Sequence, residues 1–374
     1  MKILKILRSD DEGGVLQAEI QYMKELRHQG VVINSIIVGE GRNKELYKSL
    51  SDFAIFIPRT NLSIKGSPIK KIKSIFRLKR WAKVSVETIP NEIINQTYAG
   101  IFFGRIGFMF LSHYLSKKNG AKSYYFMHSV IRDKKSLPIY KYLFRKLGIT
   151  LIANSIFTQK SFNGFCKHYF YPGYDSTRTA QYHKGKTFRD ELNIGNNTLV
   201  FGIAGRICDF KAQNWITEIL MQEKFKEKDF VLLLAGIEQD RSMLEKIKAI
   251  AAADFGKKII YLGNLSEMSK FYASIDVLIN SGKGPESFGI SVIEACASRL
   301  PIIASNVGGT AETVQDNYNG WTFNDFTIDS YDEVISRVFK EKEKIKEYGE
   351  NSLKKAEGFS AKVNVESLIQ LLNG

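Results

Sequence analysis

The chain has 374 residues, of which 44% are hydrophobic and 25% are charged, the balance of a soluble globular protein with room for two domains. Its three cysteines, Cys166, Cys208 and Cys296, have neither CxxC nor Cys/His spacing. This argues against a disulfide framework or a zinc site and is typical of a reducing cytosol. The longest apolar stretch, residues 98–115, contains Arg105 and His113, so we expect no membrane-spanning segment there.

The net charge of +15 is concentrated in the first half of the chain. Residues 1–190 contain 33 Lys and Arg against 13 Asp and Glu, a net charge of +20. The remaining residues contain 21 against 26, a net charge of −5. This asymmetry indicates that one domain faces an anionic partner.

Apolar runs alternate with helix-like segments along the chain, a pattern that predicts α/β architecture with parallel sheets. The N-terminal apolar run reaches acidic residues by Asp10, so we interpret it as a first strand and not as a signal peptide. In the first half, the predicted strands are residues 2–7, 31–38, 53–57, 92–95, 123–127 and 150–153, and the predicted helices are residues 14–29, 69–83, 104–117 and 139–147. In the second half, the predicted strands are residues 199–204, 230–235, 258–262, 277–279 and 301–304, and a helical pattern covers residues 242–253.

A polar stretch with a Pro-Gly pair, residues 171–197, separates the two halves. We therefore expect a Rossmann-like N-terminal domain at residues 1–175 and a second one at residues 195–355. A helix at about residues 356–374 is expected to pack back on the first domain. Two such βαβ domains would face each other across a deep cleft, with ligands at the carboxyl ends of the strands.

Two segments that follow predicted strands have the residue types of a phosphate site. Gly13 and Gly14 open the first helix, where paired glycines let a ligand approach the backbone; the alternative is a simple tight turn, since GxGxxG is absent. Gly205 and Arg206 follow residues 199–204, and Lys211 precedes the next helix, so the two cations could hold one diphosphate. The alternative is that they are merely two solvated cations.

The most informative segment is residues 286–294, in which two carboxylates, Glu286 and Glu294, are eight positions apart around a predicted helix start. Helix N–H groups bind anions, and carboxylates accept hydrogen bonds from sugar hydroxyls. Were the segment wholly helical, the acids would be roughly 12 Å apart, about the span of a nucleotide sugar. Two other interpretations stay open: Ser291 and Glu294 could form a capping box, and Glu286 could be an exposed loop acid.

His128 follows the predicted strand at residues 123–127, so its imidazole should point toward the ligand; a buried structural histidine is the alternative. Residues 65–83 contain eight Lys and Arg and no acid, with apolar residues near helical spacing. This basic amphipathic pattern indicates an anionic membrane surface as partner, although the apolar positions could be core. Nucleic acid is not expected, because no RNP-like or zinc-finger pattern accompanies the charge.

Glu286 through Glu294 resembles the EX7E motif of the GT-B glycosyltransferases, particularly the retaining enzymes of family 4. The similarity continues through residues 294–321 and includes the Gly13-Gly14 loop, His128, Asn154-Ser155 and the Gly205-Arg206…Lys211 segment.

The resemblance implies a role for each matched position. Arg206 and Lys211 would hold the diphosphate, Glu286 would contact the donor sugar, Glu294 would accept from the ribose, and His128 would position the reacting centre. The backbone of the matched glycines and of the helix start would border the sugar and phosphates: Gly13, Gly14, Gly205, Ser287, Phe288, Gly289 and Ile290. No metal or cofactor is implied.

The chain departs from the family pattern at several positions. Arg299 and Ala212 stand where relatives usually have glycine, Pro172-Gly173 replaces the usual Asn-Gly, and Asn95 and Gln96 stand where many relatives have a histidine near the acceptor.

From these observations we predict a retaining hexosyltransferase that uses a UDP- or GDP-linked sugar. The acceptor would be a lipid-linked glycan in bacterial O-antigen, capsule or exopolysaccharide synthesis at the cytoplasmic membrane face. Alternatives are a sugar-nucleotide epimerase on the same fold and a non-catalytic partner subunit.

Overall fold

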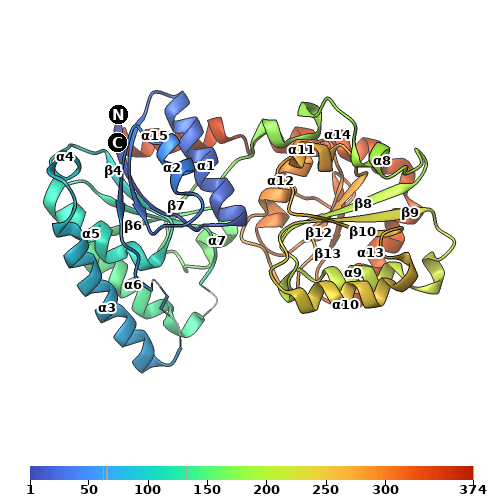
Figure 1. The fold of residues 1–374 in the computed structure, drawn as a ribbon, viewed down its shortest axis with the longest axis horizontal. Helices are drawn as coiled ribbons and strands as arrows, with labels where there is room; N and C mark the ends of the chain where they lie inside the picture. The colour runs from blue at the N-terminus through green and yellow to red at the C-terminus, as the bar shows by residue number, and fades with distance from the viewer. Residues whose placement is uncertain (62, 65, 132, 374) are drawn as a thin grey trace. The chain divides into compact units, whose positions relative to one another are not determined.

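A computed structural model describes residues 1–61, 63–64, 66–131 and 133–373 (Figure 1). The chain divides into two compact units. Unit 1 contains Met1–Pro172 and Ala361–Gly374, and unit 2 contains Gly173–Ser360. Each unit is built on a parallel sheet, which confirms the predicted α/β class.

Unit 1 has a seven-stranded sheet in the order β3-β2-β1-β4-β5-β6-β7, with every described pairing parallel. The strands are β1 (Lys2–Arg8), β2 (Val32–Val38), β3 (Phe53–Ile57), β4 (Gly100–Phe103), β5 (Ser123–Met127), β6 (Ile149–Ala153) and β7 (His168–Tyr169). The helices are α1 (Gly13–His28), α2 (Lys44–Ser49), α3 (Pro68–Glu87), α4 (Asn91–Ile94), α5 (Met109–Asn119), α6 (Leu137–Leu147), α7 (Ile156–Lys160) and α15 (Ala361–Asn373).

Helices cover both faces of this sheet, as β1 illustrates. Alternate side chains of a strand point to opposite faces. Leu4 and Ile6 belong to a core with residues of α3 and α5, whereas Ile3 and Leu7 pack with residues of α1 and α15. Lys5 therefore points toward the α1 side, where it is buried and forms an ion pair with Glu19.

Three helix and strand predictions in unit 1 are wrong. Residues 92–95 were predicted as a strand, but residues 91–94 form the short helix α4, because one helical turn after Pro90 already buries both Ile93 and Ile94. The strand in this region is β4, which was hidden inside the apolar stretch 98–115. The helix predicted from residue 104 begins at Met109, after a 3₁₀ turn at Ile106–Phe108.

Unit 2 has a six-stranded parallel sheet in the order β10-β9-β8-β11-β12-β13 around its own apolar core. The strands are β8 (Leu199–Ala204), β9 (Phe230–Ala235), β10 (Ile259–Gly263), β11 (Val277–Ile279), β12 (Ile302–Ser305) and β13 (Gly320–Phe323). The helices are α8 (Phe188–Glu191), α9 (Gln213–Leu220), α10 (Arg241–Ala251), α11 (Met268–Tyr272), α12 (Ile290–Ala297), α13 (Ile328–Lys340) and α14 (Ile345–Glu357).

The strand order reverses direction once in each sheet, between β1 and β4 in unit 1 and between β8 and β11 in unit 2. Ligands of open α/β sheets bind beyond the carboxyl ends of the strands at such switch points. The candidate residues are therefore expected beyond the carboxyl ends of β1 and β4 in unit 1 and of β8 and β11 in unit 2.

Candidate functional site

Gly13 and Gly14 begin α1, just beyond the carboxyl end of β1. Gly13 has a φ of 58°, and a Cβ atom there would meet nothing within 4 Å, so the backbone at the helix start is accessible. The preceding Asp11 is buried and forms an ion pair with Arg105, which follows β4, with a 2.8 Å bond from Nε to Oδ1. Burial raises the pKa of the Asp11 carboxyl, and Arg105 offsets part of that rise.

His128 directly follows β5, and its imidazole lies inside unit 1. Its Nε2 atom is 3.1 Å from Oε1 of Glu19 on α1, and the other Glu19 oxygen forms an ion pair with Lys5 of β1. All three side chains are at least nine-tenths buried. Burial alone would raise the pKa of Glu19, but Lys5 and His128 outweigh it and hold the pKa at about 2.

Gly104, directly after β4, provides the space for this pair. A Cβ atom at residue 104 would lie 2.7 Å from His128 Nε2 and 2.9 Å from Glu19 Oε1. Because real Cβ contacts of this length are essentially never seen, a side chain at residue 104 would displace the imidazole or the carboxylate.

In unit 2, Gly205 and Arg206 follow β8, and Lys211 closes the 3₁₀ turn before α9. The Lys211 stem passes over Gly205, where a Cβ atom would be 3.4 Å from Lys211 Cε, and its ammonium group pairs with the Glu286 carboxylate. Arg206 is exposed and donates to Gln239 Oε1 at 2.9 Å. The structure thus joins Lys211 to Glu286, while Arg206 contacts a different partner.

The loop that carries Glu286 rests on a pair of glycines after β12. Gly309 N donates to the Glu286 carbonyl at 2.8 Å. A Cβ atom at Gly308 would lie 2.8 Å from that carbonyl oxygen, and one at Gly309 would lie 2.2 Å from the Ser287 carbonyl oxygen. Only glycines permit this approach, so Gly308 and Gly309 fix the position of the loop.

The helix predicted within this segment is α12, and it begins at Ile290. Its N-cap residue is Gly289, with a φ of 93°, so no side chain caps its first turn. The capping-box interpretation of Ser291 and Glu294 is wrong, because both residues lie inside the helix. The 12 Å estimate does not apply either, since the chain from Glu286 to Gly289 is not helical.

Glu294 is buried, with 3% of its side chain exposed. It accepts from Arg178 Nε at 2.5 Å and from the Tyr272 hydroxyl at 2.8 Å. Burial and the neighbouring carboxylate raise the Tyr272 pKa far above its usual value, so this hydroxyl stays protonated and donates. Both partners of Glu294 belong to unit 2, and Glu294 follows the predicted sugar contacts at residues 286–290 by one helical turn.

Helix α3 combines an inner apolar face with an outer mixed face. Leu78, Ala82 and Val86 are buried in the core of unit 1. Ile69, Ile72, Phe76 and Val84 are between 54% and 68% exposed, so the alternative in which the apolar positions are all core is wrong for these residues. The exposed cations of this helix are Lys70, Lys73, Arg77, Lys79, Arg80 and Lys83.

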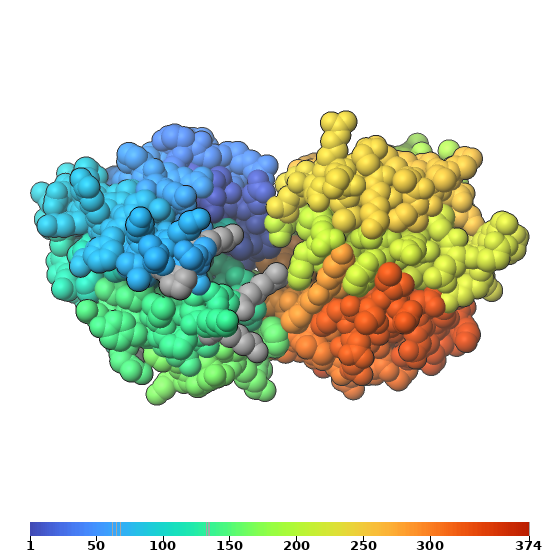
Figure 2. Space-filling view, turned by 90° about the horizontal axis from the view of Figure 1, so that it is seen from below, coloured from blue at the N-terminus to red at the C-terminus, as the bar shows by residue number. Residues whose placement is uncertain are grey.

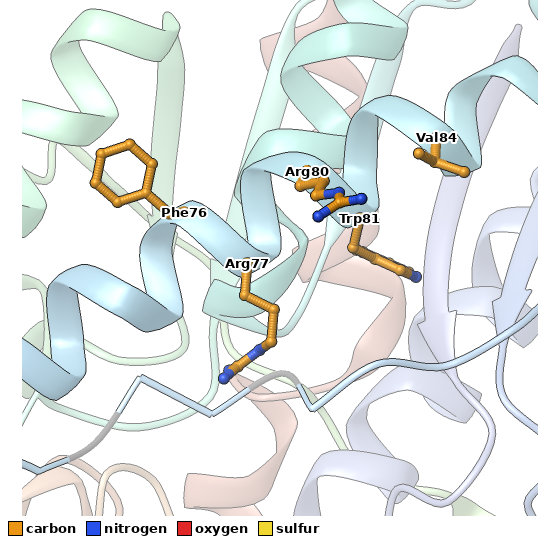
Figure 3. A pocket seen from close by; sticks show the side chains of 5 residues that line it. All are labelled: Phe76, Arg77, Arg80, Trp81 and Val84. Carbon is orange, nitrogen blue, oxygen red and sulfur yellow. The ribbon is translucent and has the colours of Figure 1, made fainter.

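A shallow surface pocket on α3 is lined by Phe76, Arg77, Arg80, Trp81 and Val84 (Figure 3). The neighbouring helix α6 extends this basic and apolar surface. Ile139 and Tyr142 of α6 are 51% and 58% exposed, and Lys71 of α3 bonds to Ser136 just before α6. Figure 2 shows α3 (blue) beside α6 (green) on one face of unit 1. We call Ile69, Ile72, Phe76, Ile139 and Tyr142, with the exposed cations of α3, the α3–α6 surface.

Within the part of the chain that the structure describes, no helix has the length and apolar character needed to cross a membrane.

The sequence of unit 2 matches a known family. Residues 185–355 match the family described as Glycosyl transferases group 1. The chain is 26% identical over 190 residues to the lipopolysaccharide 1,2-N-acetylglucosaminetransferase of Salmonella typhimurium, an alignment that covers 49% of this chain and 47% of that protein. It is 23% identical over 210 residues to the capsular polysaccharide biosynthesis glycosyltransferase CapM of Staphylococcus aureus, covering 54% of each. The matches thus span about half the length of these relatives.

The whole chain has the fold of solved glycosyltransferases. A glycosyltransferase from Rickettsia africae superposes with a TM-score of 0.80 at 20% identity, covering 99% of this chain and 97% of the other. HepE of Anabaena, in complex with UDP and glucose, superposes with a TM-score of 0.77 at 17% identity, covering 100% and 99%. These superpositions confirm the predicted GT-B class.

Several residues around the site were missed by sequence reasoning. Glu19 and Lys5 carry opposite charges within a predicted helix and a predicted strand that are otherwise apolar on one side, and this was the available signal. For Gly308 and Gly309, the available signal was a pair of glycines shortly after the predicted strand at residues 301–304. Arg178 and Tyr272 had no sequence signal, because they reach Glu294 from distant parts of unit 2.

Proposed function

We propose that the protein is a retaining glycosyltransferase that transfers a hexose from a UDP- or GDP-linked sugar to a glycan acceptor. The observation that carries the proposal is the Lys211–Glu286 pair at the β8/β11 switch point, within the residues that match group 1 glycosyltransferases. A cation and a hydroxyl acceptor side by side suit the junction between diphosphate and sugar.

The chemical step releases a nucleoside diphosphate, on which negative charge develops. Lys211, Arg206 and the N-terminus of α12 would stabilise that charge, and this preorganised electrostatic stabilisation is usually the largest part of catalysis. Donor binding would transfer Lys211 from Glu286 to the diphosphate and release Glu286 to accept from the sugar hydroxyls. Glu294 would accept from the ribose through its remaining lone pairs while Arg178 stays paired with it.

On the other unit, His128 would contact the sugar, and Gly13 and Gly14 would border the phosphate and the acceptor. Ser287, Phe288, Gly289 and Ile290 would line the sugar and phosphates with their backbone. We assign no protein nucleophile, metal ion or cofactor to the reaction.

Two relatives described above, a lipopolysaccharide N-acetylglucosaminetransferase and a capsular polysaccharide glycosyltransferase, support a role in bacterial surface glycan synthesis. UDP and glucose, present with HepE, support a nucleotide sugar as donor. We propose a lipid-linked glycan as acceptor, because the α3–α6 surface suits an anionic lipid surface.

A donor panel tests the activity. Purified protein is incubated with UDP- and GDP-sugars, with and without glycan acceptors, and the products are analysed by mass spectrometry and NMR. We expect transfer with retained anomeric configuration, and a loss of at least about 100-fold in Lys211→Ala and Glu286→Ala, as for removal of one transition-state contact. Lys224→Ala removes another ion-paired lysine of unit 2 and should retain activity.

Three outcomes would contradict the proposal. Absence of turnover, hydrolysis and binding with every donor would end it. A sugar nucleotide epimerised without acceptor would identify the epimerase alternative. Unchanged activity of a native complex that contains Lys211→Ala or Glu286→Ala would identify a non-catalytic subunit.

The membrane part of the proposal has a separate test. The protein should float with vesicles that contain anionic lipid and detach in high salt, because salt screens the attraction. Replacing Lys70, Lys73, Lys79 and Lys83 by Ser should abolish flotation. The control replaces four exposed lysines of unit 2 by Ser and should float like the original protein: Lys246, Lys257, Lys340 and Lys346. Equal flotation of both variants would refute the assignment of this surface.

A further inference from the structure

Glu19 is a buried charged residue of unit 1 that the proposed reaction does not use. It lies on α1 with both carboxylate oxygens engaged, one by Lys5 and the other by His128. Burying a carboxylate lowers the stability of a protein unless the carboxylate is paired. Because residues of β1 and of the segment after β5 both pair with Glu19, we expect it to have a functional role.

We propose that Glu19 is a positioning residue that fixes the proton of His128 on Nε2, so that Nδ1 becomes the ring atom that meets the donor sugar. The part concerning the sugar rests on the proposed function. The part concerning the proton rests on unit 1 alone.

The proton assignment follows from the hydrogen-bond inventory. An ionised carboxylate only accepts hydrogen bonds, so the imidazole atom that faces it must carry a proton. Lys5 keeps Glu19 ionised, and the depressed pKa of Glu19 agrees with this. The Nε2 to Oε1 distance of 3.1 Å is within hydrogen-bond range.

The ring is also held by its surroundings. It stacks on Phe126, with ring centroids 5.6 Å apart, and the His128 carbonyl accepts from Asn154 Nδ2 at 3.2 Å. Gly104 leaves space for the ring but none for a side chain. With its position fixed and the proton on Nε2, the uncharged form of the His128 ring presents Nδ1 as an acceptor for a sugar hydroxyl.

Glutamine at residue 19 is the informative substitution. Its amide can donate or accept, so Glu19→Gln keeps the shape but no longer selects the proton position on His128. The control is Gln21→Leu, a change of another buried polar residue of α1, whose Nε2 has no hydrogen-bond partner in the described structure.

The first measurement does not need activity. The protein has five histidines, so ¹⁵N-histidine labelling gives few signals, and a His128→Gln sample assigns the one from His128. We expect the Nε2–H form in the original protein and in Gln21→Leu, and a mixture of both tautomers in Glu19→Gln. The same ¹⁵N shifts in Glu19→Gln and the original protein would overturn the proposal.

The second measurement is kinetic. Glu19→Gln should lower kcat about 10- to 100-fold, the usual effect of removing a group that orients a functional imidazole, with KM for the donor nearly unchanged. A normal kcat in a variant with mixed tautomers would overturn the assignment of Nδ1 to the sugar. If no donor is turned over by the original protein, the proposed function fails, while the tautomer measurement still decides the role of Glu19.

A second variant tests whether the tautomer changes in Glu19→Gln only because that variant misfolds. Lys5→Met/Glu19→Gln removes both charges of the buried pair together, a change that proteins often tolerate. It should fold and show the same mixture of tautomers as Glu19→Gln. A single Nε2–H form in this double variant would overturn the proposal.

Discussion

Replacing Arg178 by methionine should destabilise unit 2 strongly. The change keeps much of the apolar stem of Arg178 but removes the only cation that is seen to contact the Glu294 carboxylate in the described structure. Glu294 is 3% exposed on its side chain, so water cannot replace the guanidinium without local opening. The carboxylate would keep the Tyr272 hydroxyl at 2.8 Å as a neutral donor.

The expected loss in free energy of unfolding is about 3–5 kcal/mol, the cost of leaving a buried charge without its partner. The geometry supports the upper part of this range, since Arg178 reaches both carboxylate oxygens, with Nε to Oε1 at 2.5 Å and Nη2 to Oε2 at 3.4 Å. Arg178→Lys keeps a charge but only one contact, so it should lose less. Arg178→Met/Glu294→Gln removes both charges and should recover most of the loss.

The assay is urea unfolding followed by tryptophan fluorescence. Trp81 belongs to unit 1, so a Trp81→Phe background leaves Trp215 and Trp321 as reporters of unit 2. Trp321 is fully buried and should respond strongly to unfolding. A loss below about 1 kcal/mol in Arg178→Met, or no recovery in the double variant, would refute the reasoning that Arg178 is the essential countercharge.

Three further predictions follow from single backbone or charge features. Arg299→Gly should raise the midpoint of urea unfolding, by about 1 kcal/mol in stability, because Arg299 has a φ of 58° that glycine adopts without strain; an unchanged or lower midpoint would contradict this. Gly309→Ala should lower stability by about 1–3 kcal/mol and reduce donor turnover, because the added methyl group would meet the Ser287 carbonyl at 2.2 Å; calorimetry and the donor assay measure this, and normal values of both would contradict it. The stability that Glu19 contributes should be complete above pH 4.5 and decline as the pH falls toward about 2, because folding depresses the Glu19 pKa; urea unfolding of the original protein and Glu19→Gln at pH 7, 4 and 3 measures it, and a difference that does not shrink with falling pH would contradict it.

The alternation of apolar runs and helices was sufficient to predict α/β architecture with parallel sheets, because a parallel strand covered on both faces is apolar over its whole length. The short strands β7 and β13 were not predicted. The 92–95 segment failed since Ile93 and Ile94 suit a strand and a buried helical turn equally well, and only tertiary packing distinguishes the two. Strand β4 (Gly100–Phe103) was missed because it merges with an apolar run that continues into α5.

The site could be predicted as far as local patterns reach. Glycines and helix starts after strands made Gly205, Glu286 and His128 candidates, because these features are local in sequence. The partners of these residues could not be derived, since Lys211 meets Glu286 across 75 positions and His128 meets Glu19 across 109. Glu19 itself was accessible to inference: it shares the buried side of α1 with Met23 and Leu26, where an acid requires a cation such as Lys5.

Ala212 and Arg299, which stand where the resemblance leads us to expect glycine, follow one physical rule. Both have left-handed backbone, with φ of 52° and 58°, so the chain keeps the conformation that glycine would adopt. At Arg299 the amide bonds back to Cys296, and Leu300 N bonds to Ala295, the Schellman pattern that ends α12. A non-glycine residue at such a position lowers the stability by about 1 kcal/mol but leaves the backbone conformation unchanged. The end of α12 and the turn that carries Lys211 therefore keep the left-handed backbone that glycine would adopt there.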